Sequence, residues 1–308
     1  MNSITNQFLW TATITPFDNE GHVDYDDLEV LANRQNEAGN GFLILGSTGE
    51  GLALTLEEKK EIVRFVSGHR LTVPVMVGVG GFNLEEQIEW IHFCNEFAID
   101  AFLLVTPLYA KPGPEGQAHW FKTLMDHAER PCMIYNVPSR TGVALHPRAL
   151  KKVENHPNLL GVKEASGQIE KFAEFRRTCP NVDFYSGDDG LMPYFAMAGC
   201  KGLVSVIANV WPKATHKYVE YSLQGRGNEL FPLWKQASEA LFVASNPIPA
   251  KVLLQHKGVI KTSVLRPPLT PDDLASKEPL IAADAAVEDW FGHEESVEHQ
   301  GEFVGRNH

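Results

Sequence analysis

The segment LLGVKEASG, residues 159–167, predicts a buried β-strand that ends in a lysine. An apolar run of strand length leads into Lys163, and a turn of small and polar residues follows it. A strand with this ending places an amine at the rim of a sheet, where partial burial disfavours the ammonium form. Such an amine can attack carbonyl compounds, so Lys163 is a candidate nucleophile. The alternative is a solvated surface lysine, which is the commoner case.

Seven other segments of strand length accompany this one, and a helical pattern follows each strand. They are residues 8–14, 42–45, 74–79, 101–105, 131–136, 182–186 and 202–207. Asp24 has the character of a helix N-cap, and Thr55 with Glu58 forms a capping-box pattern. Strands that alternate with helices form a parallel sheet, and eight such units most simply close into a barrel. The sequence therefore predicts an α/β fold, a (β/α)8 TIM barrel with additional C-terminal helices.

An open, doubly wound sheet is the alternative fold. It is expected to carry a glycine-rich dinucleotide fingerprint after the first strand, and residues 15–18 contain none. In the barrel interpretation, residues 1–225 hold the eight units and residues 226–292 form a C-terminal helical extension. Residues 293–308 are polar and acidic, which predicts a disordered tail.

The composition limits the classes of partner and the cellular location. The 308 residues carry a formal net charge of −12, which argues against a nucleic-acid partner, because phosphate binding needs clustered lysine and arginine. The four cysteines have no metal-ligand spacing, the N-terminus has no secretory pattern, and no apolar run reaches membrane-spanning length. We therefore expect a cytoplasmic protein with reduced thiols and no membrane partner. His293, His299 and His308 lack regular ligand spacing, so no metal site is expected.

Several polar residues fall at or just after the ends of the predicted strands. Because a barrel of this type places its active site at the carboxyl ends of its strands, we expect these residues to meet on one rim. They are Ser47, Thr48, Tyr109, Tyr135, Arg140 and Lys163. The turn from Gly46 to Gly49 offers backbone N–H groups and two hydroxyls to a carboxylate, at the start of a helix whose dipole favours anions.

These groups suit a reaction that proceeds through a Schiff base. A neutral Lys163 attacks the ketone of a 2-oxo acid, and the protonated imine allows the adjacent methyl to lose a proton and become an enamine that attacks an aldehyde. Tyr135 is placed to move protons, and a relay through Ser47 to Tyr109 can connect it to solvent. Arg140 can hold a second carboxylate with two hydrogen bonds. No cofactor is expected for this chemistry.

Acidic residues near these segments have simpler interpretations. Asp188 and Asp189 precede a predicted helix, so an N-cap is favoured over a metal pair or an acid–base pair. Glu50 and Glu164 could act as bases, or each could serve only to fix its loop.

Two ordered sets of motifs carry a resemblance to a known family. One is GSTGE at residues 46–50, followed by LEEK at residues 56–59. The other is YNVPSRTG at residues 135–142, followed by GVKEASG at residues 161–167, and NPIP at residues 246–249 is a smaller match. The chain resembles the dihydrodipicolinate synthases (4-hydroxy-tetrahydrodipicolinate synthases). These belong to the superfamily of pyruvate-dependent, Schiff-base class I aldolases that includes N-acetylneuraminate lyase.

The resemblance covers about residues 5–290. It implies a lyase that condenses pyruvate with L-aspartate 4-semialdehyde to give 4-hydroxy-tetrahydrodipicolinate, in lysine and diaminopimelate biosynthesis. By position, Lys163 falls on the Schiff-base lysine and Tyr135 on the catalytic tyrosine. Ser47 and Tyr109 fall on the relay partners of that tyrosine, and in the family the second of these works beside a neighbouring subunit's site.

The resemblance also implies which residues bind the substrates. Thr48 falls on the position that binds the pyruvate carboxylate, Arg140 on the arginine that receives the carboxylate of aspartate semialdehyde, and Val204 on a position lining the pyruvate pocket. The remaining substrate-binding candidates are Gly46, Gly49 and Gly187. Family members are commonly homotetramers built from tight dimers, and homodimers also occur. The implied partners are therefore small-molecule substrates and other copies of the chain.

Two positions bear on the identity of the aldehyde. Ser47 stands where the synthases commonly carry threonine and the aldolase relatives carry serine, whereas the lyases usually lack an arginine at the position of Arg140. One alternative is therefore an aldolase or lyase that acts on N-acetylneuraminate or a 2-keto-3-deoxy sugar acid. Another is a barrel that has kept the lysine but serves as a binding or scaffold protein.

The family's feedback pocket for lysine is altered in this chain. Leu108, Gly51, Leu56 and Lys59 replace the residues expected at its positions, although Glu86 matches. The resemblance therefore implies weak or absent inhibition by lysine.

Overall fold

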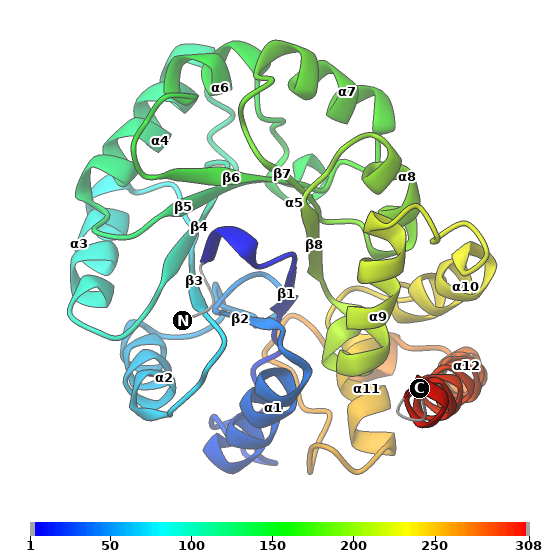
Figure 1. The fold of residues 1–308 in the computed structure, drawn as a ribbon. Coiled ribbons are helices and arrows are strands. Elements are labelled where there is room, and N and C mark those ends of the chain that lie inside the picture. Colours follow the sequence, from blue (N-terminus) through cyan, green and yellow to red (C-terminus); the bar gives the residue numbers. More distant parts are fainter. Residues whose placement is uncertain (1–3, 306–308) are drawn as a thin grey trace.

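Eight parallel strands form a closed barrel at the centre of the molecule (Figure 1). The computed structural model describes residues 4–305, with the backbone alone for residues 297–305. Neighbouring strands pair in sequence order, and β1 also pairs with β8 to close the barrel. The predicted (β/α)8 barrel is confirmed. The strands are β1 (Leu9–Ala12), β2 (Gly41–Ile44), β3 (Val75–Val79), β4 (Ala101–Val105), β5 (Cys132–Asn136), β6 (Leu159–Glu164), β7 (Phe184–Ser186) and β8 (Gly202–Ser205).

Helices surround the barrel and connect successive strands (Figure 1). The helix start signals in the sequence are used as predicted: the Asp24 carboxylate accepts from the Asp27 N–H, and Thr55 with Glu58 forms a complete capping box. The helices are α1 (Tyr25–Ala38), α2 (Leu56–Gly68), α3 (Leu84–Asn95), α4 (Pro114–His127), α5 (Pro138–Thr141), α6 (Pro147–Val153), α7 (Ile169–Thr178), α8 (Met192–Met197) and α9 (Pro212–Leu223). Short 3-10 helices are η1 (Ile4–Asn6), η2 (Asp189–Leu191), η3 (Ile207–Asn209) and η4 (Pro271–Asp273).

Side chains along each strand alternate between two apolar cores. On β5, Ile134 belongs to the core between the sheet and the helices, whereas Met133 and Tyr135 belong to the cluster inside the barrel. Trp10 fills the interior beside Gly41, where a Cβ would approach the Trp10 Cε3 to 2.5 Å. The inward side chains at the carboxyl ends of the strands therefore rest on a packed layer and not on an open pore.

Three further helices extend the fold beyond the barrel, drawn from yellow to red in Figure 1. They are α10 (Phe231–Leu241), α11 (Ile248–His256) and α12 (Glu278–Gly305). Trp234 of α10 stacks on Tyr218 of α9 with ring centroids 4.4 Å apart. The Trp211 indole N–H donates to the Asp284 carboxylate of α12 at 2.7 Å. These contacts join the extension to the barrel through α9 and the segment before it.

The end of the chain differs from the sequence-based expectation of a disordered tail over residues 293–308. Helix α12 continues to Gly305, and residues 306–308 lie outside the described residues. The Tyr221 hydroxyl of α9 donates to the Glu294 carboxylate at 2.7 Å, a tertiary contact that favours continued helix here. Within residues 4–305, no helix combines the length and the apolar character needed to cross a lipid bilayer.

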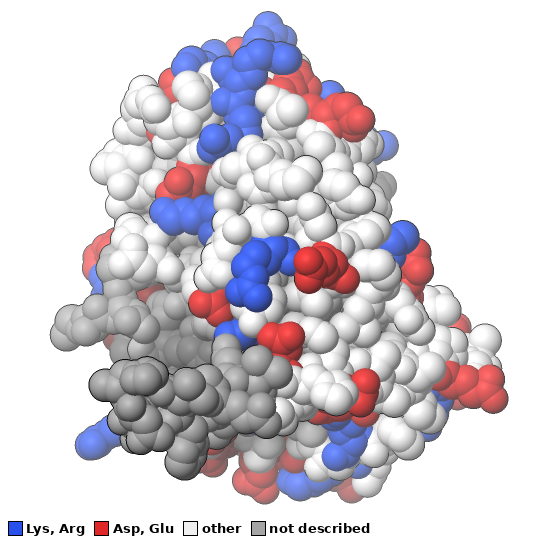
Figure 2. All heavy atoms as spheres, turned by 45° about the vertical axis from the view of Figure 1, so that its right-hand side comes forward, with Lys and Arg blue, Asp and Glu red and all other residues white. Residues whose placement is uncertain are grey.

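Acidic and basic side chains are interspersed on the face of the molecule shown in Figure 2. Many charges on the surface form local ion pairs, such as Lys235 with Glu239 on α10 and Lys122 with Asp126 on α4. Exposed pairs of this kind contribute little to stability one by one. The surface charges therefore do little to explain the fold, which rests on the two apolar cores.

Candidate active site

Lys163 and Tyr135 lie side by side inside the barrel. The parallel pairing of β5 and β6 places the two residues in register, so their side chains project from the same face of the sheet. The Lys163 Nζ lies 4.2 Å from the centre of the Tyr135 ring. Both residues are buried, with 4% and 6% of their surface exposed. The segment at residues 159–167 therefore forms what its sequence predicts, an amine held near the end of a strand and shielded from water.

Gly187, in the loop after β7, provides the space that the Lys163 side chain occupies. A Cβ at this position would lie 2.8 Å from the Lys163 Cε and 2.5 Å from the Ala165 Cβ. The Gly187 N–H donates to the Glu164 carbonyl at 2.7 Å, which holds the loop after β7 close to the end of β6. Any larger residue at this position would push the lysine out of place.

A cavity of about 240 Å³ opens beside Tyr135 among the loops at the ends of β2 to β5. Its polar wall includes Ser47, Tyr135 and Arg140, and its remaining wall is largely apolar. This volume is below the usual range for drug-sized ligands and suits a substrate of a few non-hydrogen atoms. Lys163 does not line the cavity itself but contacts the ring of Tyr135, which does.

Asn246 connects the turn after β2 to the loop after β5. Its side-chain N–H donates to the buried Thr48 hydroxyl at 2.9 Å, and its backbone carbonyl accepts from the Arg140 guanidinium at 3.2 Å. The turn is also fixed from the segment after β1, because the Thr15 hydroxyl donates to the Gly49 carbonyl at 2.6 Å. Two predicted carboxylate-binding residues, Thr48 and Arg140, are thus brought together by a residue that was not among the candidates.

No helix begins directly after the turn at residues 46–49, so the predicted effect of a helix dipole on this turn is wrong. Helix α2 begins only at Leu56, with Thr55 as its N-cap. The intervening residues form turns in which the Gly51 N–H donates to the Gly46 carbonyl at 3.1 Å. A helix dipole acts within its first turn, so α2 contributes little at Ser47 and Thr48. The groups that remain here to receive an anion are the hydroxyls, the turn's N–H groups and Arg140.

Tyr109 lies apart from the other candidates. It is 83% exposed, and its ring is 6.3 Å from that of Phe82, also exposed. Its backbone has a positive φ of 64°, fixed by a hydrogen bond from its N–H to the Thr141 carbonyl at 3.1 Å. In the described part of the chain no hydrogen bond joins Tyr109, Ser47 and Tyr135. The relay predicted from the sequence is therefore not assembled within a single chain.

Val204 and Gly46 complete the set of sequence-based candidates. Val204 is fully buried on β8, in register with Trp10 and in the same interior cluster as Tyr135. Gly46 lines the cavity next to Ser47. Val204 therefore forms part of the apolar layer inside the barrel, and Gly46 part of the rim above it.

Three carboxyl groups lie close to Lys163 in sequence or in space: Glu164 and Asp189 are buried, and Asp188 is half-buried. The Glu164 carboxylate accepts from the Asn136 amide at 2.6 Å and from the Ser166 N–H at 2.8 Å. These bonds fix the loop after β6, which is one of the two roles that the sequence left open for Glu164. Burial raises the pKa of Glu164. Burial is also the main reason why the pKa of Asp188 and the pKa of Asp189 both rise to about 6.

Asp188 occupies the N-cap position of η2, as predicted, but no side-chain hydrogen bond caps this helix. Asp188 precedes η2, but its carboxylate accepts from the Gly167 N–H at 3.0 Å. Asp189 accepts from the Ser205 hydroxyl and from the Val206 N–H, the latter at 3.0 Å. The parallel barrel brings the loops after β6, β7 and β8 together, and these carboxylates cross-link them.

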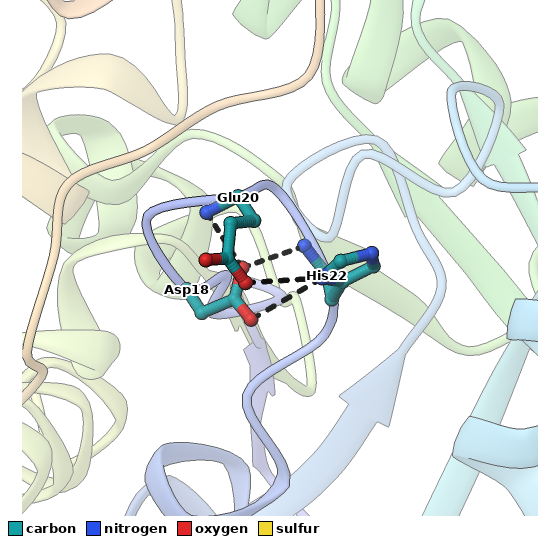
Figure 3. Close-up of side chains that lie close together, drawn as sticks. All are labelled: Asp18, Glu20 and His22. Atoms are coloured by element: carbon teal, nitrogen blue, oxygen red, sulfur yellow. Dashed lines mark hydrogen bonds and ion pairs between the residues drawn. The ribbon is translucent and has the colours of Figure 1, made fainter.

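One group of three potential metal ligands occurs in the part of the chain that the structure describes, in the loop between β1 and α1 (Figure 3). Asp18 accepts from the Glu20 N–H at 2.9 Å and from the His22 N–H at 2.8 Å, and its other oxygen lies 3.4 Å from the His22 Nδ1. Glu20 and His22 are exposed. These contacts describe a tight turn closed by its own side chain, and they carry no metal assignment.

Sequence reasoning missed Asn246 because its partners lie far away along the chain. The NPIP motif at residues 246–249 marks a feature of the family, but nothing local to it indicates a contact with Thr48, which is 198 residues away. The one usable signal is a polar residue directly before a proline-rich helix start at the end of the barrel, which is weak by itself.

Comparisons with known proteins identify the family of this chain. Residues 6–285 match the model of the dihydrodipicolinate synthetase family. The 4-hydroxy-tetrahydrodipicolinate synthase of Francisella philomiragia is 50% identical over 289 residues, which is 94% of this chain and 98% of the relative. That of Wolbachia pipientis wMel is 43% identical over 284 residues, 92% and 97% of the two chains.

Solved structures give the same result. The dihydrodipicolinate synthase from Aquifex aeolicus aligns with a TM-score of 0.85 at 29% identity, over 92% of this chain and 98% of that one. The enzyme from Cyanidioschyzon merolae with lysine bound aligns with a TM-score of 0.86 at 32% identity, over 93% and 99%. Fold, motif order and overall similarity agree: the chain belongs to the dihydrodipicolinate synthetase family.

Proposed function

We propose that this chain is a lyase of the class I aldolase type that condenses pyruvate with L-aspartate 4-semialdehyde to give 4-hydroxy-tetrahydrodipicolinate, a step of lysine and diaminopimelate biosynthesis. The observation that carries the proposal is the position of the Lys163 Nζ, buried 4.2 Å from the Tyr135 ring at the end of a barrel strand. The names of the relatives support the same reaction.

The chemistry follows from an amine in this position. Uncharged Lys163 attacks the ketone carbon of pyruvate, and loss of water gives a protonated imine. The methyl group loses a proton to give an enamine, whose carbon forms a bond to the aldehyde carbon while the aldehyde oxygen gains a proton. The amino group of the second substrate then attacks the imine carbon and releases Lys163, which closes the ring of the product.

We assign roles to the residues around this amine. Tyr135 moves protons to and from the reacting atoms, because its ring lies against Lys163 and lines the cavity. Thr48 and the turn that contains it receive the pyruvate carboxylate, and Arg140 receives the carboxylate of the aldehyde. Ser47 borders the same cavity, where it can pass a proton onward from Tyr135.

Replacing Arg140 by alanine tests the identity of the aldehyde. We expect kcat/KM for aspartate semialdehyde to fall about 30-fold, because a lost charge-assisted hydrogen bond costs about 2 kcal/mol. The KM for pyruvate should change little. Arg148→Ala, an exposed arginine on α6, is the matched control and should leave both constants unchanged. The assignment would be overturned if the wild type cleaved N-acetylneuraminate or a 2-keto-3-deoxy sugar acid but did not condense pyruvate with aspartate semialdehyde.

A second copy of the chain supports the site in this proposal. Leu52, Phe82 and Tyr109 are 65%, 58% and 83% exposed, which is unusual for large apolar or aromatic side chains near a catalytic rim. A partner that covers them would bring Tyr109 next to a neighbouring site, where it could extend the relay from Ser47. We propose a homodimer that pairs further into a homotetramer, and sedimentation velocity on the purified protein measures the state directly. A monomer with full activity would contradict this part of the proposal.

Lysine is expected to be a weak inhibitor or none. Lys59 lies in the wall of the catalytic cavity with its ammonium 5.4 Å from the Trp90 ring. A cationic amino acid that approached this wall would meet a like charge. We expect about 1 mM L-lysine to leave activity nearly unchanged, and a dose–response series in the coupled assay measures this. Strong inhibition below that concentration would refute the prediction.

Two further assignments complete the proposal. We propose a cytoplasmic location, which is supported by four free cysteines, all of them buried. We also propose that residues 1–225 act as the barrel unit and that residues 226–292 form a separate helical extension, part of which contributes to the site through Asn246.

A further inference from the structure

Glu50 and Lys251 form an ion pair that is almost completely enclosed. The Lys251 Nζ lies 2.5 Å from the Glu50 Oε1, and their side chains are 0% and 2% exposed, respectively. Lys251 lies on α11, outside the barrel, whereas Glu50 follows β2 in the turn that contains Thr48. Buried ion pairs are costly to desolvate and seldom improve stability over an apolar pair, so their presence calls for another explanation.

The surroundings of the pair fix both charges in one geometry. The Lys251 ammonium donates to the Val264 carbonyl at 2.9 Å and lies 4.0 Å from the centre of the Phe17 ring. The Arg266 N–H donates to the other Glu50 oxygen at 2.7 Å. Burial lowers the pKa of Lys251 to about 8, while the negative charge of Glu50 opposes this shift.

The backbone at Glu50 depends on such fixing. Glu50 has a φ of 54°, a left-handed conformation that is unfavourable for a residue with a Cβ. Its N–H donates to the Ser47 carbonyl at 3.2 Å, so the position of Glu50 sets the shape of the turn through Ser47 and Thr48. Anchoring the Glu50 side chain on α11 therefore anchors the turn that faces the substrate.

The same helix reaches the turn at a second point. Asn246 lies just before α11 and donates to the Thr48 hydroxyl at 2.9 Å, while the Lys251 N–H donates to the Pro247 carbonyl at 3.0 Å within the first turn of the helix. One contact from α11 and one from the residue just before its N-cap thus hold Glu50 and Thr48, which are two residues apart in the chain.

We propose that Glu50 and Lys251 are positioning residues, through which α11 holds the turn at residues 46–51 in the shape that receives the substrate carboxylate. This inference rests on the proposed function, because it assumes that Thr48 binds pyruvate. It assigns the C-terminal extension a part in substrate binding that the barrel alone does not supply.

Single and double variants separate positioning from mere stability. Lys251→Met and Glu50→Gln each remove one charge with little change of size, and each should raise the KM for pyruvate roughly tenfold or more, with a smaller effect on kcat at saturation. Each also leaves its partner charge buried and unpaired, so the melting temperature should fall. The double variant has no unpaired charge. It should recover most of the melting temperature but keep the raised KM.

Lys257→Met is the matched control. Lys257 follows α11 and pairs with Glu288 at 2.8 Å and with Asp284, away from the turn, so its loss should leave the KM for pyruvate unchanged. The inference is overturned if the double variant regains the wild-type KM, or if the single variants lower only the melting temperature. Mass spectrometry of the wild type after borohydride and pyruvate keeps the proposals apart. A missing adduct contradicts the proposed function, whereas an adduct with unchanged KM in the variants contradicts only the positioning role.

Discussion

Replacing Lys163 by alanine is expected to lower kcat at least about a thousandfold and to abolish the adduct that borohydride traps with pyruvate. The reaction proposed here runs through a covalent imine. Lys163 contacts the ring of Tyr135, whereas the one lysine in the cavity wall itself, Lys59, holds its ammonium over the Trp90 ring. Binding and orientation by the remaining groups cannot replace the electron sink that the imine provides. The loss should therefore appear in kcat and not in KM alone.

The design must separate lost chemistry from lost structure. Lys163 is only 4% exposed, so its replacement by alanine leaves a cavity. Lys163→Met instead keeps most of the length of the side chain and removes the amine. Both variants should be equally inactive. Lys171→Ala removes an exposed lysine of α7 that pairs with Glu174 and should retain full activity. An adduct of the mass of pyruvate on either Lys163 variant would show that another amine is the nucleophile.

The sequence predicts the barrel well because its information is local. Each strand is a short apolar run, each helix has its own start signal at residues such as Asp24 and Thr55, and repetition of the unit determines closure. Lys163 could be placed for the same reason, since the run before it determines that it ends a strand. Its contact with Tyr135 then follows from the pairing of consecutive strands.

The features that the sequence did not predict depend on contacts between distant segments. The hydrogen bond from Asn246 to Thr48 and the ion pair of Lys251 with Glu50 each join residues about 200 positions apart, and no local pattern indicates them. The side-chain partners of the two aspartates after β7 could not be predicted, because they lie on neighbouring loops. Local pattern determines which residues reach the rim, whereas tertiary packing determines what they touch there.

Replacing Tyr135 by phenylalanine is expected to lower kcat about a hundredfold or more, the usual contribution of a positioned proton donor or acceptor. The phenol lies in the cavity wall next to the Lys163 amine, where imine formation, loss of the methyl proton and protonation of the aldehyde oxygen all require proton transfer. Removing the hydroxyl keeps the ring against Lys163. Single-turnover measurements on this variant should therefore show that the pyruvate adduct still forms on Lys163, but more slowly than in the wild type.

Tyr185→Phe is the matched control for this prediction. Tyr185 is also buried inside the barrel and is in register with Lys163 on β7, but its hydroxyl donates to the Gln7 carbonyl at 3.1 Å, before the start of β1. That end of the barrel is opposite to the carboxyl rim, so loss of this hydroxyl should cost about 1 kcal/mol of stability without changing the rate of adduct formation. If Tyr135→Phe retained wild-type kcat, or if Tyr185→Phe slowed the reaction as much, the proton transfers would have to be assigned to other groups, with Ser47 the next residue in the cavity wall.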